Sequence, residues 1–118
     1  MACSIPYIQG FQRLLQEKFN SIVMARVYTV FVDDNFHYMD ESERYKLGEF
    51  ADCASAVAAC KQIVDEFLTT CAAKDDAELY HLYVTFGEDP WISSQDSECN
   101  FSAWNYARER AKELIPKK

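Results

Sequence analysis

Apolar side chains are grouped along the chain in ways that separate strands from helices. From Arg26 to Val32 the residues are mostly β-branched or aromatic, which predicts a β-strand. A shorter run from Tyr45 to Phe50 predicts a second strand. We expect the two to pair as an antiparallel hairpin. The first strand is apolar on both faces, so it is predicted to be central in its sheet.

Apolar residues recur at helical spacing in three segments, residues 6–20, 53–71 and 102–115. Asp52 and Ser102 come directly before the second and third segments, and both residue types cap helix N-termini. The second segment begins with an alanine-rich stretch, and alanine is the strongest helix former. We predict that it is the main core helix and that it packs on the sheet.

Residues 77–86 fit the periods of both a helix and a strand. We expect a helical turn that leads into a strand over residues 81–87, because the β-branched and aromatic content rises toward Gly87. Residues 87–92 are expected to form a loop, since Pro90 prevents a helix from continuing there.

Together these elements predict a single α+β domain, in which a small antiparallel sheet of about three strands packs with three helices. The hairpin is followed by the core helix. Residues 1–25 are expected to form an N-terminal amphipathic helical arm, and residues 26–118 a domain with the element order ββαβα. A chain of 118 residues can bury one core of this kind.

The charge balance narrows the choice of partners. A formal net charge of −7 and an isoelectric point near 4.7 argue against nucleic acid, whose backbone is bound by clustered lysines and arginines. No stretch approaches the roughly 20 apolar residues of a membrane span. Polar residues also interrupt any secretory signal near the N-terminus. We therefore expect a cytoplasmic protein, with neither nucleic acid nor a membrane as its partner.

The five cysteines are an odd number and include no CxxC pair, which fits neither a disulfide framework nor a zinc knuckle. We expect them to be reduced thiols, and we expect that no disulfide, metal or other cofactor is needed for folding. On a helical wheel Cys53, Cys60 and Cys71 fall on one stripe, which indicates small core residues.

The loop over residues 33–43 is the most chemically mixed stretch, with carboxylates, one histidine and aromatic side chains. It contains no glycine, so it is not a calcium loop of the EF-hand type. One interpretation is a small-molecule site, binding or catalytic, between this loop and residues 87–92. Its predicted lining is Asp33, His37, Asp40, His81 and Trp91. The alternative is that the acidic residues form turns and the aromatic side chains pack on the hairpin.

The N-terminal arm carries more apolar surface than a helix on the edge of a small domain needs, which favours a contact with another chain. The predicted interface residues are Tyr7, Phe11, Leu14, Leu15, Phe19 and Ile22. The same residues could instead pack on the domain itself. No stretch places a nucleophile, a base and an oxyanion donor together, so no catalytic residue is assigned. The main hypothesis is a small acidic interaction module that forms a homodimer and is not an enzyme.

Three stretches resemble a group of small uncharacterised bacterial proteins: YTVFVDDNFHYM (residues 28–39), FGEDPWI (86–92) and FSAW (101–104). The resemblance covers residues 26–112 and leaves the first helix as an addition or a variable arm. A small acidic protein of this sort is also similar to products of mobile gene cassettes. The group carries no activity to transfer, so the resemblance assigns no site residue.

Overall fold

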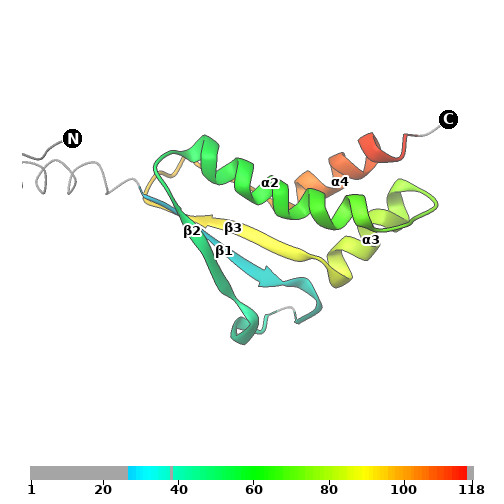
Figure 1. Ribbon diagram of the computed structural model, residues 1–118, viewed down its shortest axis with the longest axis horizontal. Helices are drawn as coiled ribbons and strands as arrows, with labels where there is room; N and C mark the ends of the chain where they lie inside the picture. Colours follow the sequence, from blue (N-terminus) through cyan, green and yellow to red (C-terminus); the bar gives the residue numbers. More distant parts are fainter. Residues whose placement is uncertain (1–26, 38, 117–118) are drawn as a thin grey trace, which may run out of the picture.

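The computed structural model describes residues 27–37 and 39–116, which form one α+β domain (Figure 1). In chain order its strands and helices are β1 (Tyr28–Asp34), β2 (Tyr45–Phe50), α2 (Cys53–Thr70), α3 (Asp76–Phe86), β3 (Glu88–Ser93) and α4 (Ala103–Leu114). Two short 3-10 turns, Asn35–His37 and Glu41–Glu43, lie between β1 and β2. The helix predicted over residues 6–20 lies outside the described residues.

The three strands form an antiparallel sheet with the order β2-β1-β3. The predicted hairpin is confirmed, because β1 pairs with β2, and β1 is the central strand as its two apolar faces indicate. Val30 and Val32 of β1 are completely buried and pack in one cluster with Ala56 and Cys60 of α2. The core helix predicted after Asp52 is therefore confirmed in both its position and its partner face.

In Figure 1, α2 and α4 run beside each other above the sheet, and α3 lies at one end of it. The three helices share a second buried cluster. It consists of Val64, Leu68, Leu79, Tyr83, Ala103, Ala107 and Ala111. All three α4 members are alanines, so α4 can lie close to its neighbours without a large side chain between them. The final helix is confirmed as predicted, with Ser102 accepting a hydrogen bond from the amide of Asn105.

The strand predicted over residues 81–87 is wrong, because α3 continues through Phe86. Asp75 caps this helix by accepting a hydrogen bond from the amide of Glu78. Leu79 and Tyr83, four residues apart, are buried on one face. Packing of this face against α2 and α4 outweighs the β-branched and aromatic content that favoured a strand. The described order is ββααβα, one helix more than predicted.

The loop predicted over residues 87–92 is also wrong, because most of it is β3. Pro90 is buried in this strand and lies opposite Val32 of β1. Proline has no backbone N–H to donate, and a central strand needs such donors for neighbours on both sides. In the described residues β3 is at the edge of the sheet and pairs with β1 alone, so it needs donors on one side only. The proline that argued against a helix is thus compatible with an edge strand.

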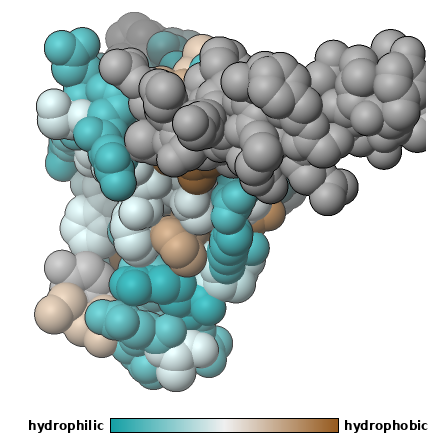
Figure 2. Space-filling model, turned by 90° about the vertical axis from the view of Figure 1, so that its left-hand side faces the viewer, coloured by the Kyte–Doolittle hydropathy of each residue, from teal (hydrophilic) through white to brown (hydrophobic). Residues whose placement is uncertain are grey.

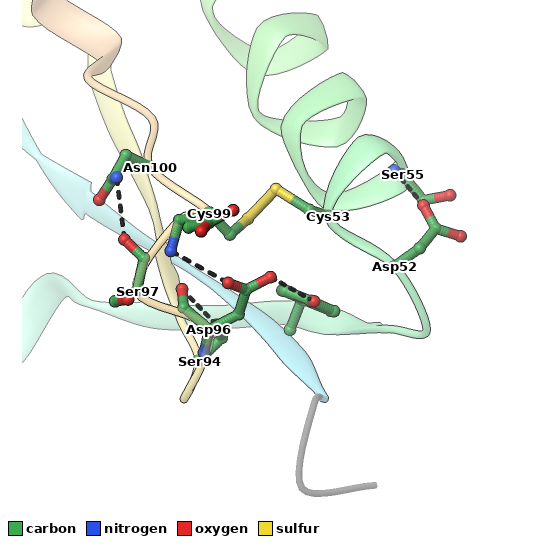
Figure 3. Close-up of a disulfide and its surroundings, with 10 residues drawn as sticks. Asp52, Cys53, Ser55, Ser94, Asp96, Ser97, Cys99 and Asn100 are labelled. Carbon is green, nitrogen blue, oxygen red and sulfur yellow. Dashed lines mark hydrogen bonds between the residues drawn. A yellow bond between two sulfur atoms is a disulfide. The ribbon is translucent and has the colours of Figure 1, made fainter. Parts of the chain in front are cut away.

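The structure also corrects the expectation of five reduced cysteines. Cys53, at the first residue of α2, forms a disulfide with Cys99, in the segment between β3 and α4, and their Cα atoms are 5.8 Å apart (Figure 3). The helical stripe identified Cys53 as inward-facing, but sequence spacing cannot show that residues 94–100 pass over the start of α2. Cys60 and Cys71 are free, and burial raises the pKa of the Cys60 thiol to about 11.

We predict that Gly87→Ala destabilises the fold while Gly48→Ala does not. A Cβ atom at Gly87 would lie 2.5 Å from the Tyr83 ring and 2.8 Å from the Tyr83 carbonyl oxygen, whereas one at Gly48 would meet nothing closer than 3.8 Å. Because Tyr83 is fully buried and cannot move aside, Gly87→Ala should lower the free energy of unfolding by about 1–3 kcal/mol. Urea denaturation of both variants tests this, and equal effects would contradict it.

We predict that the disulfide contributes about 2–4 kcal/mol to stability, because it closes a long loop with a sequence separation of 46 residues. The Cys53→Ser/Cys99→Ser variant should lose that amount in urea denaturation, while Cys71→Ser, at a free cysteine, should be nearly neutral. In the denatured chain without reductant, no more than three of the five thiols should react with a thiol reagent. Reaction of all five would mean that the bond is absent.

Candidate functional site

A small cavity of about 130 Å³ lies between the acidic loop after β1 and the start of β3. Its lining consists of Asp33, Asp34, Asn35, His37, Met39, Asp40, Glu41, Arg44 and Asp89. This is the region in which the sequence predicted a ligand site. The structure brings three of the predicted residues together here, namely Asp33, His37 and Asp40.

Arg44 neutralises Asp33 within this cavity. Its Nε and Nη2 atoms donate to the two carboxylate oxygens at 2.6 and 3.1 Å, which is the bidentate geometry that suits a guanidinium. This pairing lowers the pKa of Asp33. The guanidinium also lies 5.0 Å from the centre of the Trp91 ring. The indole nitrogen of Trp91 lies close enough to Asp33 to contribute to the lowering of its pKa. This nitrogen is buried and has no hydrogen-bond partner among the described residues.

Asp34, His37 and Glu43 form a cluster of ligand-type atoms within 4.8 Å of one another. Asp34 accepts a hydrogen bond from the His37 imidazole at 2.9 Å, which raises the pKa of His37 and lowers that of Asp34. His37 and Glu43 are exposed, so water competes for any ion held there. The residue types suit a divalent cation, but exposed acidic groups commonly lie this close without one.

A larger cavity of about 460 Å³ lies between β3, α3 and the start of α4. It is lined by Tyr80, Asp89, Trp91, Phe101, Ser102, Ala103, Trp104, Asn105 and Arg108. Its volume falls in the usual range for small-molecule sites, and aromatic side chains with a few polar groups are a typical lining. Asp89 belongs to the lining of both cavities.

Asp89 is the electrostatically unusual residue of this region. It lies opposite Asp33 in the β1–β3 pairing, and like charges in that position repel each other. Arg44 neutralises Asp33, but the side chain of Asp89 has no hydrogen bond or ion pair among the described residues. Burial, with a contribution from the Asp33 charge, raises the pKa of Asp89 to about 6. A carboxyl group perturbed in this way beside a cavity is a candidate functional group.

Asn35 fixes the walls of both cavities relative to one another. It is buried at the end of β1, and its Nδ2 donates to the carbonyl oxygen of Tyr83 at 3.0 Å. Its Oδ1 accepts from the indole nitrogen of Trp104 at 3.1 Å, and its backbone amide donates to the carbonyl oxygen of Gly87 at 3.0 Å. One residue thus connects β1 to α3, to α4 and to the glycine that precedes β3.

The remaining predicted site residues are dispersed. Trp91 lines the larger cavity and stacks on Phe31 with ring centres 5.0 Å apart. His81 is exposed on α3 and lines neither cavity, so the structure does not bring it together with His37 and Trp91. The six predicted interface residues of the N-terminal arm lie outside the described residues.

Sequence reasoning missed Asp89 and Arg108. Asp89 was assigned to a loop, and a loop gives no register that would set it against Asp33. Arg108 lies on the helix predicted over residues 102–115, but a helical period does not show which residues of β3 it would meet. A pairing of β1 with residues 88–93 would have revealed the two facing carboxylates.

The outer edge of β2 is a further surface of interest. In the described residues β2 pairs only with β1, and most of its side chains are exposed or half-exposed. The pairing register shifts between Val30 and Phe31, so that Gly48 and Lys46 face consecutive β1 residues and Leu47 is bulged. The bulge brings Lys46 and Glu49 onto one face, where they form an ion pair with an N–O distance of 2.5 Å.

Figure 2 shows the domain from the end at which β1 and α2 begin. The part of this face that grey atoms leave uncovered is mainly hydrophilic, and its brown residues are scattered. A partner that binds the visible part of this end would therefore meet polar side chains in the main.

The chain matches no protein-family model, no curated protein and no solved structure. Among the described residues, the helices fall short of the length and apolar character that crossing a bilayer requires.

We predict opposite pH dependences for two neighbouring substitutions. The raised pKa of Asp89 means that its contribution to stability is present below about pH 4 and is lost as the pH rises through about 6. Asp89→Asn should therefore melt above the wild type at about pH 8, and the gap should close near pH 4. Cys60 and Tyr83 also face this carboxylate, but both stay neutral in that range.

Asp33→Asn is the matched control, because the pKa of Asp33 is lowered by Arg44. Its contribution is present above about pH 4 and is lost as the pH falls. This variant should melt below the wild type at about pH 8 and approach it in acid. Thermal melts over the pH range test both variants, and a shift of the same sign in both would contradict the assignment.

Proposed function

We propose that this chain is a small interaction module that forms a homodimer through the outer edge of β2. The observation that carries the proposal is that the β2 sequence, YKLGEF, is complementary to itself when it runs antiparallel to a second copy. The two central strands, β1, would then belong to one continuous sheet of both protomers.

The complementarity follows from a two-fold axis between Leu47 and Gly48. An isologous pairing there sets Tyr45 opposite Phe50 of the second copy and Lys46 opposite its Glu49. Lys46 and Glu49 lie on one face of the strand in each protomer. The dimer would therefore contain two symmetric contacts between opposite charges and two between aromatic side chains, and both kinds stabilise antiparallel pairs.

An open strand edge needs either a partner or protection, because its amides and carbonyls can pair with any other strand. A lysine on such an edge commonly prevents pairing. In the proposed dimer, Glu49 of the second copy lies opposite Lys46. The charge of Lys46 therefore favours pairing with a second copy of this strand and still disfavours pairing with other strands. Tyr45 and Leu47 are also exposed, at 43% and 42%. Dimerisation would bury part of their apolar surface against the second copy.

Charge reversal tests this register. Lys46→Glu and Glu49→Lys each place like charges opposite one another twice in the dimer, and we expect each to weaken dimerisation at least tenfold, or about 1.4 kcal/mol. The Lys46→Glu/Glu49→Lys variant restores opposite charges at both contacts and should recover the affinity of the wild type. Sedimentation equilibrium from micromolar to millimolar concentrations measures all four proteins.

Lys112→Glu is a control with the same change of net charge on α4, away from β2, and it should dimerise like the wild type. The N-terminal arm is the alternative contact, and Phe11→Asp/Leu15→Asp in the full chain tests it separately. A dimer lost in this variant and kept in Lys46→Glu would move the interface to the arm. A wild type that stays monomeric at millimolar concentration would overturn self-association altogether.

Within this proposal the chain acts by contact and not by catalysis. The compartment of the protein affects how the dimer should be measured. Disulfides persist mainly in oxidising compartments, so the Cys53–Cys99 bond argues against the cytoplasmic location that the sequence suggested. The dimer is therefore best measured without reductant, in the state that keeps α2 joined to residues 94–100.

A further inference from the structure

The larger cavity has a charge arrangement that the proposed dimer does not use. Asp89 of β3, which carries a carboxylate, and Arg108 of α4, which carries a guanidinium, belong to the same lining. Neither has an ion-pair partner among the described residues, although most other arginines and lysines of the domain have one. A ligand that carries one positive and one negative charge could form an ion pair with each of these two groups.

Asp89 supplies the acidic end of this arrangement. Its position opposite Asp33 is unfavourable, and no cation of the described residues compensates it. A neutral residue at this position would serve the sheet better. A ligand ammonium group would remove the penalty by giving the carboxylate the partner that it lacks.

The basic part of the lining is formed by Arg108 and the first turn of α4. Arg108 lies 4.8 Å from the Tyr80 ring centre, and it donates to the Tyr80 hydroxyl at 3.0 Å and to the Asn105 side chain at 3.2 Å. These neutral contacts hold the guanidinium in place and leave its charge uncompensated. Ser102 caps the amide of Asn105, and the first-turn residues of α4 line the cavity with the positive end of a helix of 12 residues.

Aromatic side chains form a large part of the remaining cavity wall. Trp91, Phe101 and Trp104 line the cavity, and Trp104 is held by its hydrogen bond to Asn35. Their positions are thus set by the fold before any ligand arrives. Such a wall favours a ligand with an apolar carbon frame.

We propose that this cavity binds a small zwitterion, whose ammonium group pairs with Asp89 and whose carboxylate pairs with Arg108 and the first turn of α4. The carbon frame lies against the tryptophan and phenylalanine side chains. Amino acids are the class of metabolite with this chemistry. The spacing of the two charges distinguishes an α-amino acid from a longer ω-amino acid.

Two zwitterionic probes, L-phenylalanine and 6-aminohexanoate, test the two spacings by titration calorimetry on the full chain. Each is compared with fragments that carry one charge, phenethylamine and 3-phenylpropanoate for the first, hexylamine and hexanoate for the second. We expect one zwitterion to bind at least tenfold more tightly than both of its fragments. A zwitterion no better than its amine would exclude the role of Arg108, and one no better than its acid would exclude that of Asp89.

Three variants assign the contacts. Asp89→Asn should bind the zwitterion no better than the wild type binds the acid fragment, and Arg108→Gln no better than it binds the amine fragment. Glu88→Gln is the matched control, because Glu88 precedes Asp89 on β3, and its carboxylate accepts a hydrogen bond from Tyr45 outside the cavity. It should leave binding unchanged. Circular dichroism establishes that each variant is folded.

The proposal is overturned if neither probe gives heat at millimolar concentration, or if Asp89→Asn and Arg108→Gln bind the zwitterion as the wild type does. Dimerisation is measured on the same samples by sedimentation. Loss of the dimer with binding intact, or the reverse, shows which of the two proposals has failed.

Discussion

The hydrogen bonds of Asn35 are the constraint on which the relative placement of β1, α3 and α4 depends. A buried amide is costly unless its donors and acceptors are satisfied, and here the Tyr83 carbonyl and the Trp104 indole satisfy both ends. The two partners also fix which atom of the amide is nitrogen and which is oxygen. Because they lie on different helices, α3 and α4 can satisfy Asn35 only in one arrangement relative to β1, and this arrangement opens the larger cavity.

Tyr83 extends this constraint to β3. Its hydroxyl donates to the carbonyl of Glu88 at 2.6 Å, and the amide of Gly87 donates back to its carbonyl at 2.8 Å. The helix thus ends where the strand begins, with no loop in between, and Gly87 is required because the Tyr83 ring occupies the space of a side chain. The same junction sets the register of β3, and with it the position of Asp89 opposite Asp33.

The elements that the sequence predicted well are those whose side-chain pattern and burial agree. β1, β2, α2 and α4 have clear periods and caps, and their partners lie on the faces that those periods indicate. The α3–β3 junction was misplaced because the decisive contact, between Tyr83 and residues far along the chain, has no local signal. The residues of the candidate site were predicted least well. Asp33 and Trp91 were identified from residue type alone, whereas the positions of Asp89 and Arg108 depend on strand register and helix packing. The disulfide was missed for the same reason, as only the path of residues 94–100 brings Cys99 to Cys53.

The two surfaces proposed for function lie on opposite edges of one sheet, and β1 connects them. The edge at β2 keeps its charges exposed, and each is already compensated by a neighbour, so it can meet a partner at little desolvation cost. At the β3 edge, residues of α3 and α4 line a cavity with Asp89, whose carboxylate no described residue compensates. Uncompensated charge persists in a fold only where something other than stability maintains it. This asymmetry between the edges is the basis on which we propose a second chain as the partner at β2 and a small charged molecule as the ligand at β3.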